Sequence, residues 1–197
     1  HHEHRRQRQM CIRDRAILRS TPNLNLIRPA DTVETAEAWD IALKTNGPTV
    51  LALSRQGLRA FRCEKSSENK VSKGGYLVND ISSKRDLTLI ATGSEVEIAM
   101  EASELLIAEG IKASVVSLPC WELFDKQDET YKKEILGNSP RIAIEAACDM
   151  GWSKYIGDNG VFIGMKNFGA SGPADQLYKH FGITSEAVVK QARSIIK

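Results

Sequence analysis

The chain has 197 residues, of which 42% are hydrophobic, and its formal net charge at pH 7 is +2. This length holds one large domain or two small ones with a real hydrophobic core, and no apolar run approaches the ~20 residues of a membrane span. The near-neutral charge indicates no nucleic-acid partner and no membrane partner.

Residues 1–15, HHEHRRQRQMCIRDR, have no helical or strand period and carry five arginines against one glutamate and one aspartate. A basic arm for nucleic acid and an arginine-rich transit segment are two interpretations. A third fits better, because residues 5–14 back-translate codon by codon to a transposase adapter used in sequencing libraries, and Arg15 matches in part. We therefore expect residues 1–15 to be an adapter-like, disordered artefact that packs against nothing. The protein's own sequence would then begin near Ala16.

Residues 16–56 predict part of an α/β domain. Leu24–Arg28 favours a short strand, and Thr49–Leu53 favours a buried one. Between them Asp31 and Glu34 form a capping-box pair that predicts a helix. These elements are too few for a closed domain, so we expect a remnant, called the N-terminal unit below. The helix is predicted to turn four apolar residues inward, namely Ala36, Trp39, Ala42 and Leu43.

Residues 57–85 are polar and contain KSSENK, SKGG and SSK. Within them only Gly75–Ile81 has the apolar residues of a strand. This composition predicts an interdomain linker with one short strand.

Residues 86–118 hold the clearest pattern of the chain. Leu87–Ala91 predicts a buried strand, and Ile111–Leu118 predicts a second one rich in β-branched residues. Between them Ser94 and Glu97 suit a capping box, and Gly110 suits a helix stop. The helix is predicted to bury one apolar stripe. A strand, a helix and a strand in so few residues predict a right-handed βαβ unit with parallel strands. The stripe consists of Ile98, Ala102, Leu105 and Leu106.

Further elements extend this unit to the end of the chain. Asp128–Leu136 predicts a short helix, Arg141–Ala147 a third parallel strand and Val161–Met165 a last strand, and a terminal helix begins at Thr184 or Ser185. The predicted fold class is α/β, a three-layer sandwich with a mainly parallel sheet over residues 86–197. The partial α/β domain of residues 16–56 precedes it.

Four polar features stand where sites are found, but a structural role is the better interpretation of each. Glu145 near a strand end and Asp149 in the next loop suit acid–base chemistry, yet a capping or inter-element hydrogen bond accounts for both. FGASGP at 168–173 resembles a phosphate-binding loop, yet a tight turn accounts for it. His180 has no second ligand in reach by sequence and fits a surface or boundary position.

Three cysteines follow Cys11 and show neither a CxxC pair nor a metal-site spacing. Such a sparse, odd set is typical of a reducing compartment, so we expect incidental thiols and a cytoplasmic protein. No Ser/His/Asp or Cys/His set can be assembled. We expect no catalytic residue and no metal or cofactor ligand in this chain. The three cysteines are Cys63, Cys120 and Cys148.

Six stretches form a combination that is specific for one family. They are PNLNLIRPADTVETAEAW at 22–39, GPTVLALSRQ at 47–56, GGYLV at 74–78, LIATGSEVEIA at 89–99, VVSLPCWELFDKQDETYKKEIL at 115–136 and FIGMKNFGASGPADQLYKHFGIT at 162–184. Together they resemble the C-terminal part of transketolase, from about Ala16 to Lys197. Deoxyxylulose-phosphate synthase and the β subunits of 2-oxo acid dehydrogenases share the fold but lack the set of LSRQ, ATGSEVE and FGASGPA.

The resemblance implies a parent enzyme of the pentose phosphate pathway that moves a two-carbon ketol unit between sugar phosphates. It also implies thiamine diphosphate, Mg2+ and a homodimer, with the cofactor and metal ligands upstream of this chain. Residues 16–56 would be the end of the pyrimidine-binding domain and residues 86–197 the C-terminal domain, inactive alone. Alternatives are a stand-alone binding or dimerisation module, or a fragment of one of the two related enzymes.

Arg55 is the one site residue that the resemblance transfers to this chain. In the family the arginine of LSRQ contacts the phosphate of the sugar substrate. A planar, permanently charged guanidinium after a strand end can hold phosphate oxygens bidentately. From the residues alone, a solvated arginine at a strand end is the more frequent interpretation. With the family match, we expect Arg55 to bind substrate.

Overall fold

The computed structural model describes residues 13–63, 66, 68–79, 81 and 84–196. None of the helices in this described part is long and apolar enough to cross a membrane. The elements are α2 (Arg15–Arg19), β1 (Asn25–Ile27), α3 (Thr32–Lys44), β2 (Thr49–Leu51), η2 (Lys70–Lys73), β3 (Tyr76–Asn79), β4 (Leu87–Ala91), α4 (Glu95–Ala108), β5 (Ala113–Ser117), α5 (Trp121–Asp125), α6 (Glu129–Leu136), β6 (Arg141–Glu145), α7 (Ser153–Ile156), β7 (Val161–Gly164), α8 (Ala174–Phe181) and α9 (Ser185–Ile195).

Within the described residues, five strands form one sheet in the order β3-β5-β4-β6-β7. Strands β4, β5, β6 and β7 are parallel to one another, and β3 is antiparallel to β5. Leu87 of β4 lies opposite Ala113 of β5, with α4 as the connection between the two strands. The predicted βαβ unit and the mainly parallel sheet are confirmed.

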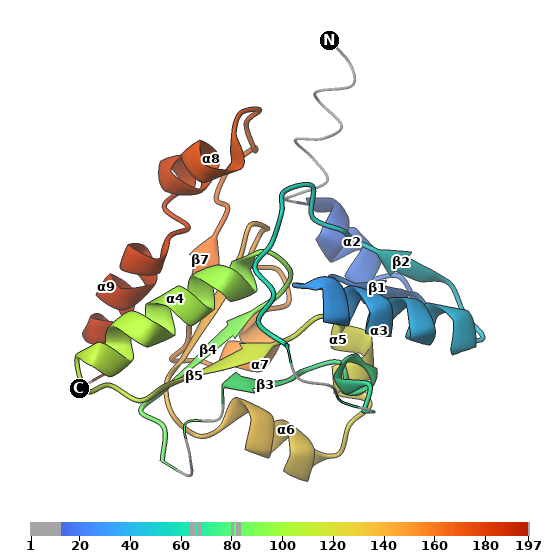
Figure 1. Cartoon of the computed structure of the whole chain (residues 1–197), viewed down its shortest axis with the longest axis horizontal. Coiled ribbons are helices and arrows are strands. Elements are labelled where there is room, and N and C mark those ends of the chain that lie inside the picture. The colour runs from blue at the N-terminus through green and yellow to red at the C-terminus, as the bar shows by residue number, and fades with distance from the viewer. Residues whose placement is uncertain (1–12, 64–65, 67, 80, 82–83, 197) are drawn as a thin grey trace.

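Helices cover both faces of this sheet, which makes the predicted three-layer sandwich (Figure 1). Leu89 and Ile144 pack into one cluster with α4 and α9. Ile90 and Val116 point to the other face, where they meet side chains of α5, α6 and α7. This alternation follows from the two-residue period of a strand, and a sheet with both faces covered favours near-continuous apolar runs in its strands.

The sheet begins before Asp86, where the predicted linker was to end. Tyr76 of β3 pairs with Ser117 of β5, and Asn79 accepts a hydrogen bond from the backbone N–H of Val115. The predicted short strand therefore exists but is the antiparallel edge of the sheet. Composition alone placed this strand in the linker, because the polar residues around it do not reveal that it pairs with β5.

The N-terminal unit consists of α2, α3 and two parallel strands, β1 and β2, which lie together on one side of the molecule (Figure 1). The predicted helix start is confirmed, because the N–H of Glu34 donates to Asp31 Oδ1 at 2.8 Å. The Glu34 carboxylate in turn accepts from the N–H of Ala30 at 2.7 Å. Strand β2 is shorter than predicted and half-buried, not buried.

Three of the four predicted inward positions of α3 are wrong, because Ala36, Trp39 and Leu43 are exposed. Trp39 is 53% exposed and Leu43 is 82% exposed. Their faces have no covering layer among the described residues, whereas Ala38 and Ile41 of the same helix are buried. The helix therefore exists as predicted, but it buries the face with Ala38 and Ile41 and not the predicted apolar stripe.

The predicted capping box at Ser94 and Glu97 is also wrong. Ser94 has helical backbone angles and its side chain makes no capping hydrogen bond. Its hydroxyl instead accepts from Arg28 at 3.0 Å and donates to Glu95 at 2.9 Å. Within the helix that follows, Leu105 is 47% exposed although it was predicted to face inward.

Candidate functional site at the carboxyl ends of two sheets

The five-stranded sheet and its covering helices, residues 76–195, form the C-terminal unit. The carboxyl ends of the two sheets face each other at the junction of this unit with the N-terminal unit. Arg28 follows β1, and its N–H donates to the carbonyl of Pro119 at 2.9 Å. The carbonyl of Arg28 accepts from the N–H of Gly93, just after β4, at 3.1 Å. A Cβ at Gly93 would lie 2.7 Å from the Arg28 side chain, so only glycine permits this approach. Ligands of parallel sheets gather at such edges, but protein side chains fill this one.

Arg28 and Glu95 form a bidentate ion pair in the middle of this junction. Arg28 is 7% exposed and Glu95 is fully buried. The guanidinium donates to both carboxylate oxygens, to the hydroxyl of Ser94 and to the carbonyl of Thr92. Burial acts to lower the pKa of Arg28, but the Glu95 carboxylate outweighs it and the pKa is raised. Two buried charges are stable here because each satisfies the other with hydrogen bonds.

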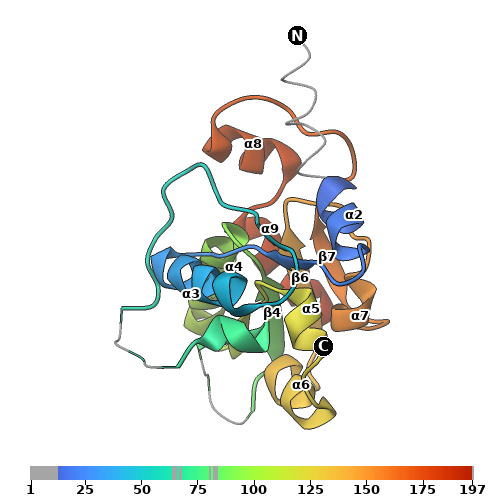
Figure 2. The ribbon, with the colours of Figure 1, turned by 90° about the vertical axis from the view of Figure 1, so that its right-hand side faces the viewer.

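Helix α8 joins the same cluster through one side chain. The Tyr178 hydroxyl donates to the Ser94 hydroxyl at 3.0 Å and to the Glu95 carboxylate. No residue of α8 is buried, and the helix stands apart from the sheet in both ribbon views (Figure 2). Burial and the nearby carboxylate raise the pKa of Tyr178, so the hydroxyl keeps its proton and can donate.

Glu145, the last residue of β6, is the centre of a second buried cluster. Its carboxylate accepts from Arg15 at 2.8 Å, from Arg19 at 2.8 Å and from the indole N–H of Trp152 at 2.9 Å. Arg28 lies 3.8 Å away. Burial acts to raise the pKa of Glu145, but the arginines outweigh it and the pKa is well below its usual range. The predicted inter-element hydrogen bond is confirmed.

The prediction that residues 1–15 pack against nothing is wrong at Arg15. This residue begins α2 and is 7% exposed, because its guanidinium reaches the Glu145 carboxylate and the carbonyl of Ala146. Residues 1–12, with Met10 and Ile12, lie outside the described residues, so the adapter interpretation stays a prediction for them.

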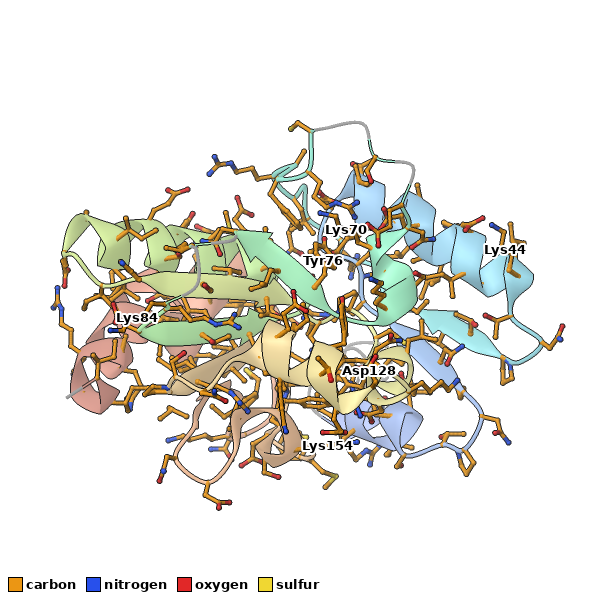
Figure 3. The ribbon with its side chains drawn as sticks, turned by 90° about the horizontal axis from the view of Figure 1, so that it is seen from below. Lys44, Lys70, Tyr76, Lys84, Asp128 and Lys154 are labelled. Atoms are coloured by element: carbon orange, nitrogen blue, oxygen red, sulfur yellow. The ribbon has the colours of Figure 1, made fainter. Side chains whose placement is uncertain are left out.

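A third buried carboxylate joins α3 to the sheet without any arginine. Glu34 is fully buried and accepts from the hydroxyl of Tyr76 at 2.7 Å and from that of Ser117 at 2.6 Å. Burial raises the pKa of Glu34 to about 7. The Tyr76 ring also contacts Lys70, whose ammonium lies 5.7 Å from the ring centre (Figure 3).

Arg55 lies apart from these clusters, in a bend after β2, and is exposed. Among the residues that the structure describes, none makes a hydrogen bond or ion pair with its side chain. Strands β1 and β2 are held together up to Ile27, whose carbonyl accepts from the N–H of Ala52 at 2.9 Å. The Arg55 guanidinium is thus free to meet a ligand, and its predicted role stays a prediction.

The other sequence candidates do not assemble into a site. Asp149 is exposed, and His180 is exposed beside Phe181. Cys63, Cys120 and Cys148 are free, and burial raises the pKa of the Cys120 thiol. In the described part of the chain, no group of three or more His, Cys, Asp or Glu could hold a metal ion. These residues therefore do not fit a metal-bound diphosphate.

Three residues that hold the junction together, Arg19, Arg28 and Glu95, were not predicted from the sequence. Arg28 interrupts the apolar stretch LNLIRPA, and Glu95 stands in the first turn of a helix directly after a buried strand. A charge next to a buried strand was the available signal. Its partner lies far along the chain, and sequence spacing could not identify it.

Comparison with known proteins identifies the family. The family model described as the transketolase-like C-terminal domain matches residues 74–184, and that of the transketolase pyrimidine-binding domain matches residues 3–60. The chain belongs to the transketolase family. The first of these matches begins just before β3, in agreement with the place of that strand in the sheet, and the second includes most of the segment predicted to be adapter-like.

Individual relatives agree with this assignment. The chain is 54% identical over 184 residues to the transketolase of Sinorhizobium medicae, covering 92% of this chain and 26% of the relative. The transketolase of Leishmania mexicana superposes with a TM-score of 0.85 at 42% identity, over 94% of this chain and 27% of that one. A Pichia stipitis transketolase in complex with sedoheptulose 7-phosphate gives the same four values. The chain thus spans about a quarter of the length of these relatives.

Proposed function

We propose that this chain is the C-terminal part of a transketolase. The whole protein would transfer a two-carbon ketol unit between sugar phosphates in the cytoplasm, within the pentose phosphate pathway. The observation that carries the proposal is 54% identity to a transketolase across 92% of this chain. The Pichia stipitis relative was solved with a sugar phosphate, which supports that substrate class. These matches favour transketolase over the related enzymes and over a stand-alone module.

Thiamine diphosphate with Mg2+ would supply the carbanion chemistry in the whole protein. Because the described residues offer no metal site, the groups that hold the cofactor would come from the rest of a homodimer. The proposal therefore includes that the present chain is inactive alone. What this chain would contribute is the sheet edge that carries Arg55.

The buried contacts explain how that edge is held. Arg28 fixes the carboxyl end of β1 to α4 through Glu95, and Glu34 fixes the start of α3 to the sheet. Strand β2 follows β1 in register, with Leu51 opposite Ile27. The C-terminal unit is thus the support against which the segment with Arg55 is placed, and Arg55 would bind the substrate phosphate.

The test restores the missing N-terminal portion from the Sinorhizobium medicae transketolase and compares Arg55→Ala with the parent. A charge-assisted hydrogen bond contributes about 1.5–3 kcal/mol, so kcat/KM for a phosphorylated sugar should fall by roughly 10- to 150-fold, mostly through KM. Arg55→Lys should rescue only part, because an ammonium cannot reproduce the bidentate contact.

Two controls make the result specific. Arg59 is an exposed arginine nearby, 4.0 Å from Glu104, and Arg59→Ala should leave kcat/KM almost unchanged. An unphosphorylated acceptor aldehyde should barely respond to Arg55→Ala. Equal losses for phosphorylated and unphosphorylated substrates would show that Arg55 supports the fold and does not bind phosphate. An inactive parent chimera would instead contradict the transketolase proposal itself.

A further inference from the structure

A pocket of about 270 Å³ lies between α5, α6 and α7 on the C-terminal unit. Figure 3 views the molecule from the side of α6 and labels Lys154, one of the residues that line the pocket. Arg141, which also lines the pocket, is the first residue of β6, whereas Glu145 of the junction is the last. The pocket therefore belongs to the opposite end of the sheet from the site described above.

Helix α6 forms one wall of the pocket with a single face. Glu129, Lys132, Lys133 and Leu136 all line it and follow each other at i, i+3, i+4 and i+7. Such a spacing brings side chains together on one side of a helix. Four cations and two carboxylates line the pocket in total, in a chain whose overall charge is near zero.

Both carboxylates are already neutralised by two of the cations. Lys132 pairs with Glu129 at 3.0 Å, and Lys154 pairs with Asp125 at 2.6 Å. Asp125 also accepts from the Tyr155 hydroxyl at 3.0 Å. The carboxylates thus have partners inside the pocket, and two positive charges remain without a carboxylate partner.

Those two charges belong to Lys133 and Arg141. Among the described residues, none makes a hydrogen bond or ion pair with the Lys133 ammonium. The Arg141 guanidinium donates to the carbonyl of Tyr155 at 2.8 Å and to that of Gly137, but to no carboxylate within the described part of the chain. Burial lowers the pKa of Arg141, as expected for a cation that lacks a charged partner.

The carbonyl end of α6 does not oppose an anion in this pocket. The carbonyl of Gly137 accepts from Arg141, and that of Ile135 accepts from Arg85 at 3.0 Å. These guanidinium groups therefore cover the negative end of the helix dipole. Apolar side chains lie directly behind the pocket, since Phe124 is fully buried, Tyr155 is 2% exposed and Leu136 is 8% exposed.

We propose that this pocket binds a small phosphate monoester. Its dianionic phosphate would meet the surplus of two positive charges at Lys133 and Arg141, and its carbon portion would rest against Leu136 and the methylene groups of the lining lysines. A volume of about 270 Å³ holds one small organic molecule of this kind. The assignment rests on the C-terminal unit alone and does not depend on the proposed transketolase activity.

The test uses the whole chain and phenyl phosphate as the probe, titrated by isothermal calorimetry or by amide chemical shifts. The parent should show saturable one-site binding, stronger than that of inorganic phosphate, and phenol should not bind. Lys133→Gln should weaken phenyl phosphate binding by about 5- to 10-fold, between the effects of an exposed ion pair and of a buried charged hydrogen bond.

Lys190→Gln is the matched control, because Lys190 is an exposed lysine on α9 outside the pocket. It changes the net charge by the same amount and should leave affinity within twofold, on the order of the effect expected for distant surface charges. Lys133 is itself exposed, so its substitution leaves the fold intact. Equal weakening by both substitutions, or no saturation by phenyl phosphate, would overturn the proposal. Equal affinity for inorganic phosphate would overturn the assignment to a monoester.

Discussion

Two fully buried glutamates join the N-terminal unit to the sheet, and their surroundings differ in charge. Glu145 accepts from the guanidinium groups of Arg15 and Arg19. Glu34 accepts only from hydroxyls and a backbone N–H, with Tyr76 as one donor. Charged donors hold the pKa of Glu145 well below its usual range, while burial raises that of Glu34 to about 7. The same residue type, equally buried, is thus held ionised in one place and shifted towards its neutral form in the other.

The two shifts give opposite dependences of stability on pH. For Glu145 the folded pKa is depressed, so its stabilising contribution is present above the ordinary carboxyl pKa and is lost as the pH falls below it. For Glu34 the folded pKa is raised, so its contribution is present at low pH and is lost as the pH rises towards about 7. The junction should therefore be most stable in a window near pH 5.

Removal of Glu145 should have the largest effect. Glu145→Ala leaves Arg15, Arg19 and the indole of Trp152 buried without their common acceptor, and breaking such a pair costs about 3–5 kcal/mol of unfolding free energy. Urea unfolding at pH 7 measures this loss. The control is Glu109→Gln, which removes an exposed pair with Arg193 and should not change the midpoint measurably. Similar losses in both variants would contradict the idea that the buried cluster stabilises the junction.

Substitution of Glu34 should change the pH dependence of stability. Glu34→Gln is neutral at every pH, so it removes the loss that the wild type suffers between pH 4.5 and about 7. Relative to this variant, the wild type should lose about 3 kcal/mol of unfolding free energy across that range. Urea unfolding at several pH values gives the comparison. Parallel pH curves for the two proteins would show that Glu34 is ionised in the fold without penalty.

The smallest effect is expected on the other side of the N-terminal unit. Leu43 is 82% exposed, so Leu43→Ser should change the unfolding free energy by no more than about 0.5 kcal/mol. Ile41→Ser on the same helix is the matched comparison, because Ile41 is 8% exposed and its substitution should destabilise the protein clearly. A large loss for Leu43→Ser would mean that this face is covered in solution.

The sequence by itself determined the local elements that have a strong period. The strand, helix and strand between Leu87 and Ser117 follow from their apolar pattern, as does the parallel pairing of β4 and β5. The helix start at Asp31 and Glu34 was equally predictable, because a capping box closes within a few residues. In each case the partners lie near one another in the chain or repeat with a fixed period.

Tertiary structure alone decided how the units meet. The Ser94 hydroxyl does not make the predicted capping bond, because it accepts a hydrogen bond from Arg28, which is distant in the chain. Glu145 became the common acceptor of Arg15 and Arg19 for the same reason. Burial makes such contacts strong, since an unpaired charge in the interior is far more costly than an unfilled cap at the surface. Pairing of buried charges therefore outweighs the local preference for a helix cap. The partners in such pairs cannot be identified from spacing along the sequence.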